Sequence, residues 1–271
     1  MSVNRFCRLR WGIIGAAYLV LVSCVAAPVE ETRAFSNAAI AVKSAGDLLF
    51  DELSAAERRS YKASYRRNFQ KAYVFEVADA PYFATIGELP DVAAFRNALD
   101  VIKNYAALLV SLAEGQDVEK TRSQLLAISS NLAAIAKFSQ FAPAAAAITS
   151  IIDQALKANS IAVARRIVLD GAPAVRDIIA LLKDASPSIF KALAGDLLAT
   201  GAEAKALDAK RVTVATFVML LDSLASVFDR LVLAFEQPSS PASLASLLEF
   251  TANLNADVTA ARKAFAEVRQ R

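Results

Sequence analysis

The chain has 271 residues, of which 56% are hydrophobic, with 30 basic and 27 acidic side chains and no histidine. The lack of histidine excludes Ser-His and Cys-His nucleophile arrangements and histidine-ligated zinc or iron. Three arginines and no acid precede Cys24, so the remainder of the chain has 27 residues of each charge. This neutrality argues against a general nucleic-acid binder, which needs a surplus of basic residues.

The first 24 residues have the pattern of an export signal. Arg5, Arg8 and Arg10 give a positively charged start, and an apolar run follows from 11 to 22. This run is shorter than the roughly 20 residues that a helix needs to cross a bilayer. We therefore interpret it as the apolar core of a signal peptide.

The sequence LVSC, which ends at Cys24, resembles the lipobox of bacterial lipoproteins. The resemblance implies that the Cys24 thiol receives a diacylglyceryl group and that a signal peptidase cuts before this residue. It further implies acylation of the new amine in many bacteria, and two or three acyl chains anchor a protein stably. Val25, in place of aspartate, implies an outer-membrane lipoprotein that faces the periplasm. The alternatives are ordinary cleavage after Ala27 and an uncleaved signal anchor.

We expect five segments along the chain. They are a signal peptide at 1–23, a tether at 24–34, an N-terminal helix at 35–73, an irregular connection at 74–90 and a helical bundle at 91–271. Pro81, Gly87 and Pro90 disfavour helix in the connection, so we expect it to separate the N-terminal helix from the bundle. Within it, 74–77 could form a short strand, which would have no partner.

The segment from 57 to 73 interleaves aromatic and basic residues on one side of a helical wheel. Such mixing is typical of interfaces that meet anionic groups. It predicts a candidate interface to lipid headgroups, lipopolysaccharide phosphates or an acidic protein, formed by Arg58, Arg59, Tyr61, Lys62, Tyr65, Arg66, Arg67 and Phe69. The alternative is a helix whose tyrosines pack inward while its basic side chains reach out to water.

Later in the chain, apolar residues recur at alternating steps of three and four, which predicts helices packed along heptad seams. The seams cover 92–113, 125–135, 217–231 and 244–268. Gly115 is expected at the turn of an αα-hairpin, with its second helix running to about Phe141. The predicted fold is an all-α, elongated antiparallel helical bundle with coiled-coil-like heptad seams and no significant sheet.

Three prolines mark helix boundaries in the second half of the chain. Ser186-Pro187 and Ser240-Pro241 have the pattern of helix starts. Gly171-Ala172-Pro173 is expected to break the stretch 143–183 in two.

Two groups of acids are candidates for metal or acid-base chemistry. Asp222, Asp229 and Glu236 recur every seven residues, and roughly 10 Å of helix separates neighbours seven positions apart, too far to share one ion. Glu76 and Asp79 fall in the irregular connection, where a divalent cation site is the alternative to ordinary surface acids. We interpret both groups as solvent-facing, and we expect no metal and no cofactor.

The sequence has no P-loop, no dinucleotide-binding glycine pattern, no nucleophile elbow and no C-x-x-C pair. We therefore expect no catalytic residues. The function predicted is that of a lipid-anchored envelope protein that acts by binding, in an assembly, secretion-accessory or immunity-type role. Its partners would be the membrane, through the N-terminal lipid, and an envelope protein, with no nucleic acid. The alternative is a carrier of a lipid or other apolar ligand in a cavity of the bundle.

Overall fold

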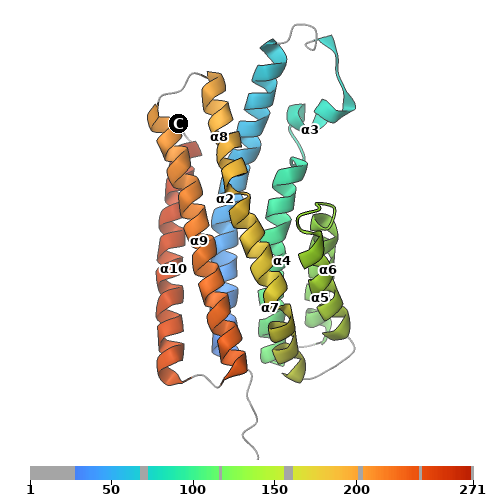
Figure 1. Ribbon diagram of the computed structural model, residues 1–271, viewed down its shortest axis with the longest axis vertical. Helices are drawn as coiled ribbons and strands as arrows, with labels where there is room; N and C mark the ends of the chain where they lie inside the picture. Colours follow the sequence, from blue (N-terminus) through green and yellow to red (C-terminus); the bar gives the residue numbers. More distant parts are fainter. Residues whose placement is uncertain are drawn as a thin grey trace, which may run out of the picture.

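The computed structural model describes residues 28–67, 73–115, 118–155, 161–200, 204–237 and 240–269. In these ranges the chain is all-α with no strand, and Figure 1 shows the long helices running along the long axis. The elements are α2 (Val29–Arg67), η2 (Val77–Asp79), α3 (Ala80–Phe83), α4 (Pro90–Ala113), α5 (Val118–Ile135), α6 (Ala142–Ala155), α7 (Ile161–Asp184), α8 (Ser186–Thr200), α9 (Ala204–Glu236) and α10 (Pro241–Arg269). The predicted all-α helical bundle is confirmed, and 74–76 form no strand.

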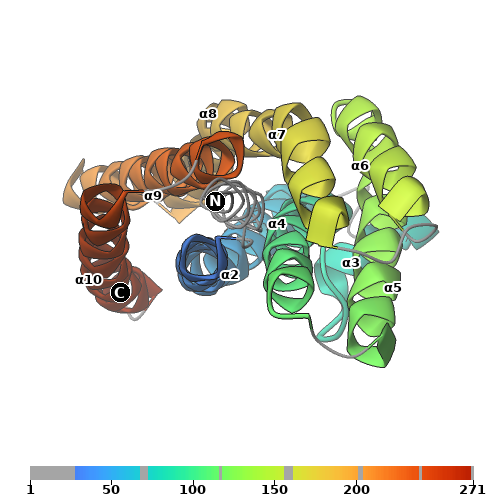
Figure 2. The same cartoon turned by 90° about the horizontal axis from the view of Figure 1, so that it is seen from below.

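Helix α2 is the central helix of the bundle. It packs against α4, α8, α9 and α10, and Figure 2 shows it between α10 and α4. A Cβ atom at Gly46 would lie 2.5 Å from Leu99 Cδ1, so glycine lets α2 and α4 approach closely at this point. The expectation that 74–90 separates this helix from the bundle is wrong, because α2 contributes a full face to the common core.

The expected tether at 24–34 is also wrong for its second half, because α2 already begins at Val29. The Thr32 N–H donates to the Pro28 carbonyl oxygen at 3.0 Å, and the Thr32 side chain is fully buried. Arg33 forms a 2.7 Å ion pair with Glu114 at the end of α4. Packing therefore extends the helix beyond the predicted start at 35. The buried core lies between Ala34 and Phe265, so a chain that begins at Val25 keeps all of it.

The heptad seams form the buried faces of their helices. The predicted seam of α4, from Val92 to Ala113, is buried at every position. Leu125, Ile128, Leu132 and Ile135 of α5 are buried as well. The seam of α10 is buried from Leu247 to Phe265, and the side chain of Val268 lies outside the described part. Gly115, at the end of α4, has a φ of 63°, which fits the predicted turn. Helix α5 ends earlier than expected, because a turn occupies 136–141 before α6 begins.

Helix α7 passes through Gly171-Ala172-Pro173 without a break, contrary to the sequence prediction. The Tyr105 hydroxyl of α4 donates to the Ile167 carbonyl oxygen at 2.7 Å, one turn before Gly171. A Cβ atom at Gly171 would lie 2.6 Å from that hydroxyl oxygen. Packing against α4 and α9 thus outweighs the local preference of Pro173 to end a helix. The predicted helix starts at Ser186 and Pro241 are confirmed.

Candidate functional site

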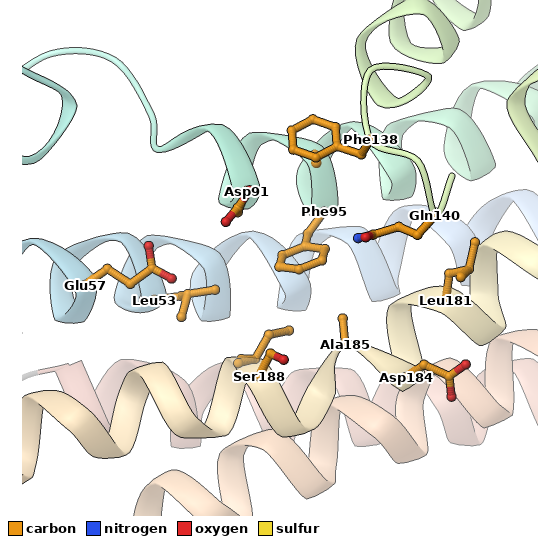
Figure 3. A pocket seen from close by; sticks show the side chains of 12 residues that line it. Leu53, Glu57, Asp91, Phe95, Phe138, Gln140, Leu181, Asp184, Ala185 and Ser188 are labelled. Carbon is orange, nitrogen blue, oxygen red and sulfur yellow. The ribbon is translucent and has the colours of Figure 1, made fainter. Parts of the chain in front are cut away.

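A cavity of about 410 Å³ opens beside α2, α4 and the junction of α7 with α8. Figure 3 shows its lining side chains converging from these elements and from the turn after α5. Its apolar wall is formed by Leu53, Phe95, Phe138, Leu181 and Ile189. Leu53, Phe95 and Ile189 belong to the buried core, so the cavity is an interruption of the core packing at the bundle surface.

Three carboxylates give the cavity an acidic lining. Glu57 and Asp91 point toward one another across the space between α2 and α4, and Asp184 lies at the other end (Figure 3). Burial, and secondarily the charge of Asp91, raise the pKa of the Glu57 carboxyl. Such a site suits a neutral or cationic apolar molecule and disfavours a fatty-acid anion. In the described part of the chain, no group of three acids or cysteines could hold a metal ion.

This cavity was not predicted from the sequence. Glu57, Asp91 and Asp184 come from three different helices, and no spacing connects them. In the sequence, Glu57 is only the first residue of the basic-aromatic segment 57–73. The sequence does show Asp91 at the start of one apolar helix and Asp184 at the end of another. It does not show that these two helix ends border the same cavity.

The second candidate feature is residues 73–89, which we name the tip segment. It includes η2 and α3, connects α2 to α4, and stands at the end of the molecule opposite the start of α2 (Figure 1). Arg58 holds it from α2 through two bonds. Its Nε donates to the Pro81 carbonyl oxygen at 3.1 Å, and its Nη2 donates to the Gly87 carbonyl oxygen at 2.7 Å.

Two tyrosines of α2 complete the attachment of the tip segment. The Tyr61 ring stacks on Tyr82 with centroids 4.0 Å apart and an interplanar angle of 11°. The Tyr61 hydroxyl donates to the Asp79 carboxylate, and the Tyr65 hydroxyl donates to the same group at 3.2 Å. The hydrogen bond to Asp79 raises the pKa of Tyr61 to about 12. Asp79 is only 4% exposed, so the interpretation of this acid as solvent-facing is wrong.

The structure divides the predicted interface residues into two groups. Arg58, Tyr61 and Tyr65 make contacts inside the molecule, as the alternative interpretation expected for the tyrosines. Arg59 forms a 3.0 Å ion pair with Glu52. The Lys62 ammonium lies 5.8 Å from the centroid of the Phe83 ring, while Arg66 and Arg67 are exposed at the end of α2. Phe69 lies outside the described residues.

The tip segment also exposes large apolar side chains. The exposed fractions are 80% for Tyr73, 53% for Val74, 68% for Phe75, 87% for Val77 and 82% for Ile86. Elsewhere in the described chain, exposed apolar side chains are more widely spaced along the helices. The apolar run VFEV at 74–77 is the signal for this feature in the sequence, although the run also fits a short strand, which would have no partner.

The acids of α9 cross-link helices. Asp229 forms a 2.7 Å ion pair with Arg176 of α7, and Asp222 forms one with Lys183 of the same helix. Glu236 is exposed. Asp222 and Asp229 therefore join α9 to α7 through ion pairs, and they do not form a metal or acid-base site with Glu236.

Comparison of the chain with protein-family models, with curated proteins and with solved structures found no match. Among the helices that the structure describes, none combines the length and the apolar character needed to span a bilayer.

Proposed function

We propose that this chain is a lipid-anchored helical-bundle protein of the bacterial envelope that acts by binding. The resemblance of LVSC to a lipobox supports lipidation at Cys24. The described chain starts at Pro28 and is helical from Val29, so only a few residues would separate the lipid from the bundle. The anchor would be in the outer membrane, with the body in the periplasm.

The observation that carries the binding role is the tip segment. Several large apolar side chains exposed on one short segment indicate an interaction site. Here Phe75, Val77 and Ile86 are exposed on a segment that Arg58, Tyr61 and Tyr65 attach firmly to α2. A surface that is already ordered loses little conformational entropy when it binds. Assembly, secretion-accessory and immunity-type roles all need such a surface.

The anchor is tested by substituting Cys24 with alanine in the full chain and expressing it in a Gram-negative host. Cys7→Ala is the matched control, because Cys7 also precedes the bundle but lies outside LVSC. The wild type and Cys7→Ala should fractionate with the outer membrane and yield a lipid-modified N-terminal peptide by mass spectrometry. Cys24→Ala should give no modified peptide. An unmodified N-terminus in the wild type would refute the anchor.

The carrier role remains a second candidate, and the cavity between α2, α4 and α8 favours it. The neutral apolar dye Nile red should bind a chain that begins at Val25. Ser188→Trp should weaken that binding, because Ser188 is an exposed residue that lines the cavity. Ser226→Trp, at an exposed position of α9, should leave Nile red binding unchanged. Equal dye binding by the two variants would count against the carrier role.

A further inference from the structure

We propose that the tip segment docks on the surface of an anionic bilayer, where Phe75, Val77 and Ile86 insert among the lipids. This inference rests on the binding role proposed above and names the partner. It does not depend on lipidation of Cys24, since the tip stands at the opposite end of α2 (Figure 1).

The exposure of the apolar side chains is the first argument. Val77 and Ile86 are more than four-fifths exposed, and Phe75 is two-thirds exposed. Most of the surface of these side chains is therefore available for transfer into lipid. Tyr73 and Tyr82 belong to the same segment, and tyrosine is enriched at the level of the lipid headgroups, where one end of its ring is apolar and the other polar.

The charge around the tip is the second argument. Lys62, Arg66 and Arg67 lie in the last turns of α2, the helix that precedes the tip segment in the chain. The acids of the tip segment are Glu76, Asp79 and Glu88. Asp79 is buried and accepts hydrogen bonds from two tyrosines, Glu88 pairs with Arg96 at 2.9 Å, and Glu76 is exposed. Basic side chains beside an inserted apolar group are attracted to anionic headgroups.

The shape of the tip is the third argument. The segment projects at the end of the bundle (Figure 1), and Phe75, Val77 and Ile86 do not line the cavity beside α2, α4 and α8. A projecting group of apolar side chains can insert into a fluid bilayer, whereas a folded protein would need a matching hollow to cover it. The bonds from Arg58, Tyr61 and Tyr65 fix the segment in position, so insertion does not require it to fold first.

The test uses a chain that begins at Val25, which keeps the whole core and lacks Trp11, the sole tryptophan of the sequence. Phe75→Trp then places one fluorophore at the tip. Met219→Trp, at a 63% exposed position of α9, is the matched control. With vesicles of phosphatidylcholine containing 30% phosphatidylglycerol, the emission of Phe75→Trp should shift to the blue. Vesicles of phosphatidylcholine alone should cause no shift, and Met219→Trp should respond to neither.

Sedimentation with the same vesicles gives the affinities. Phe75→Ser with Ile86→Ser should weaken binding at least tenfold, and so should Arg66→Glu with Arg67→Glu. Met219→Ser with Leu233→Ser, two exposed apolar residues of α9, should leave binding unchanged. Circular dichroism should show the same helix content in all these variants, because none of the substituted side chains belongs to the core.

Several results would overturn the proposal. They are an unshifted Phe75→Trp spectrum with anionic vesicles, equal binding to both kinds of vesicle, and full binding by the serine variant. A tip that mediates only self-association in sedimentation velocity, or that binds only an acidic protein, would also overturn it. Because the chain used with the vesicles lacks Cys24, a negative vesicle result would not affect the proposal of a lipid anchor. Failure of the Cys24 experiment, in turn, leaves this test valid.

Discussion

The Lys210 ammonium of α9 lies 2.7 Å from the Glu52 carboxylate of α2, and both side chains are less than a tenth exposed. Arg59, which is half exposed, reaches the same carboxylate oxygen at 3.0 Å. A buried carboxylate is tolerated only when it is paired. This cluster therefore fixes the register of two helices that are 158 residues apart at this point of the sequence.

Lys210→Met should destabilise the protein by about 2–4 kcal/mol, because it leaves the buried Glu52 carboxylate with Arg59 as its remaining partner. The double variant Glu52→Leu with Lys210→Met should lie within about 1 kcal/mol of the wild type, since no buried charge is then left unpaired and Arg59 extends into water. Urea unfolding followed by circular dichroism measures both values. If the double variant were as unstable as the sum of its single substitutions, the pair would not act as a unit.

Tyr105 and Gly171 should show strong coupling in a double-mutant cycle. Gly171→Ala should cost about 1–3 kcal/mol, because its Cβ would lie 2.6 Å from the Tyr105 hydroxyl oxygen. Tyr105→Phe should cost about 1 kcal/mol through the lost hydrogen bond to Ile167. In the Tyr105→Phe background the cost of Gly171→Ala should nearly vanish, since the clash is relieved and alanine favours helix by about 1 kcal/mol. Additive costs from chemical denaturation would disprove this packing relationship.

Glu57→Gln should change the pH dependence of stability. The pKa of Glu57 is raised in the folded state, so the stability that this carboxyl contributes is present below its unfolded pKa and lost as pH rises through the folded value. The variant, which has no charge to bury, should therefore melt about 1–2 °C above the wild type at pH 7. This advantage should disappear near pH 4. Glu249→Gln, on the exposed side of α10, should show no such trend.

Arg58→Ala should loosen the tip segment while leaving the bundle folded. The substitution removes the bonds to the Pro81 and Gly87 carbonyl oxygens, which are the two that join Arg58 to the tip. Limited proteolysis with chymotrypsin should then cut between 73 and 83 several times faster than in the wild type, because cleavage follows local opening. Arg66→Ala, at an exposed position on the same helix, is the control. Equal cleavage of the two variants would show that the tyrosine contacts suffice.

The sequence predicted the helices best where apolar periodicity decided the outcome. The seam of α4, from Val92 to Ala113, is buried at every position, because a heptad repeat specifies one face of a helix. The boundaries were less predictable. Val29 to Ala34 look like a polar tether, yet they form the first turns of α2, because Thr32 and Ala34 pack inside the bundle. Pro173 is within a helix because Tyr105 and its neighbours support that helix from outside, which no local pattern records.

The candidate sites were predictable only in part. The segment from 57 to 73 is unusual in the sequence because it interleaves aromatic and basic residues, but the sequence alone could not show that Arg58 and Tyr61 contact Pro81 and Asp79. Those contacts join residues about 20 positions apart through an irregular turn. The cavity could not be predicted at all, since Glu57, Asp91 and Asp184 line one cavity only when their three helices pack together. The apolar residues of the tip can be read from the sequence, but their exposure depends on tertiary structure.

The unbroken length of α2 has a mechanical consequence. A helix of 39 residues is about 58 Å long, and α2 begins next to the proposed lipid and ends at the tip segment. The length of α2 therefore sets the distance between the proposed lipid anchor and the tip segment. If both ends engage the same bilayer, the bundle must lie along the membrane, with one flank turned toward the lipid and the other toward the periplasm. A seven-residue insertion in α2 would lengthen that spacing by about 10 Å.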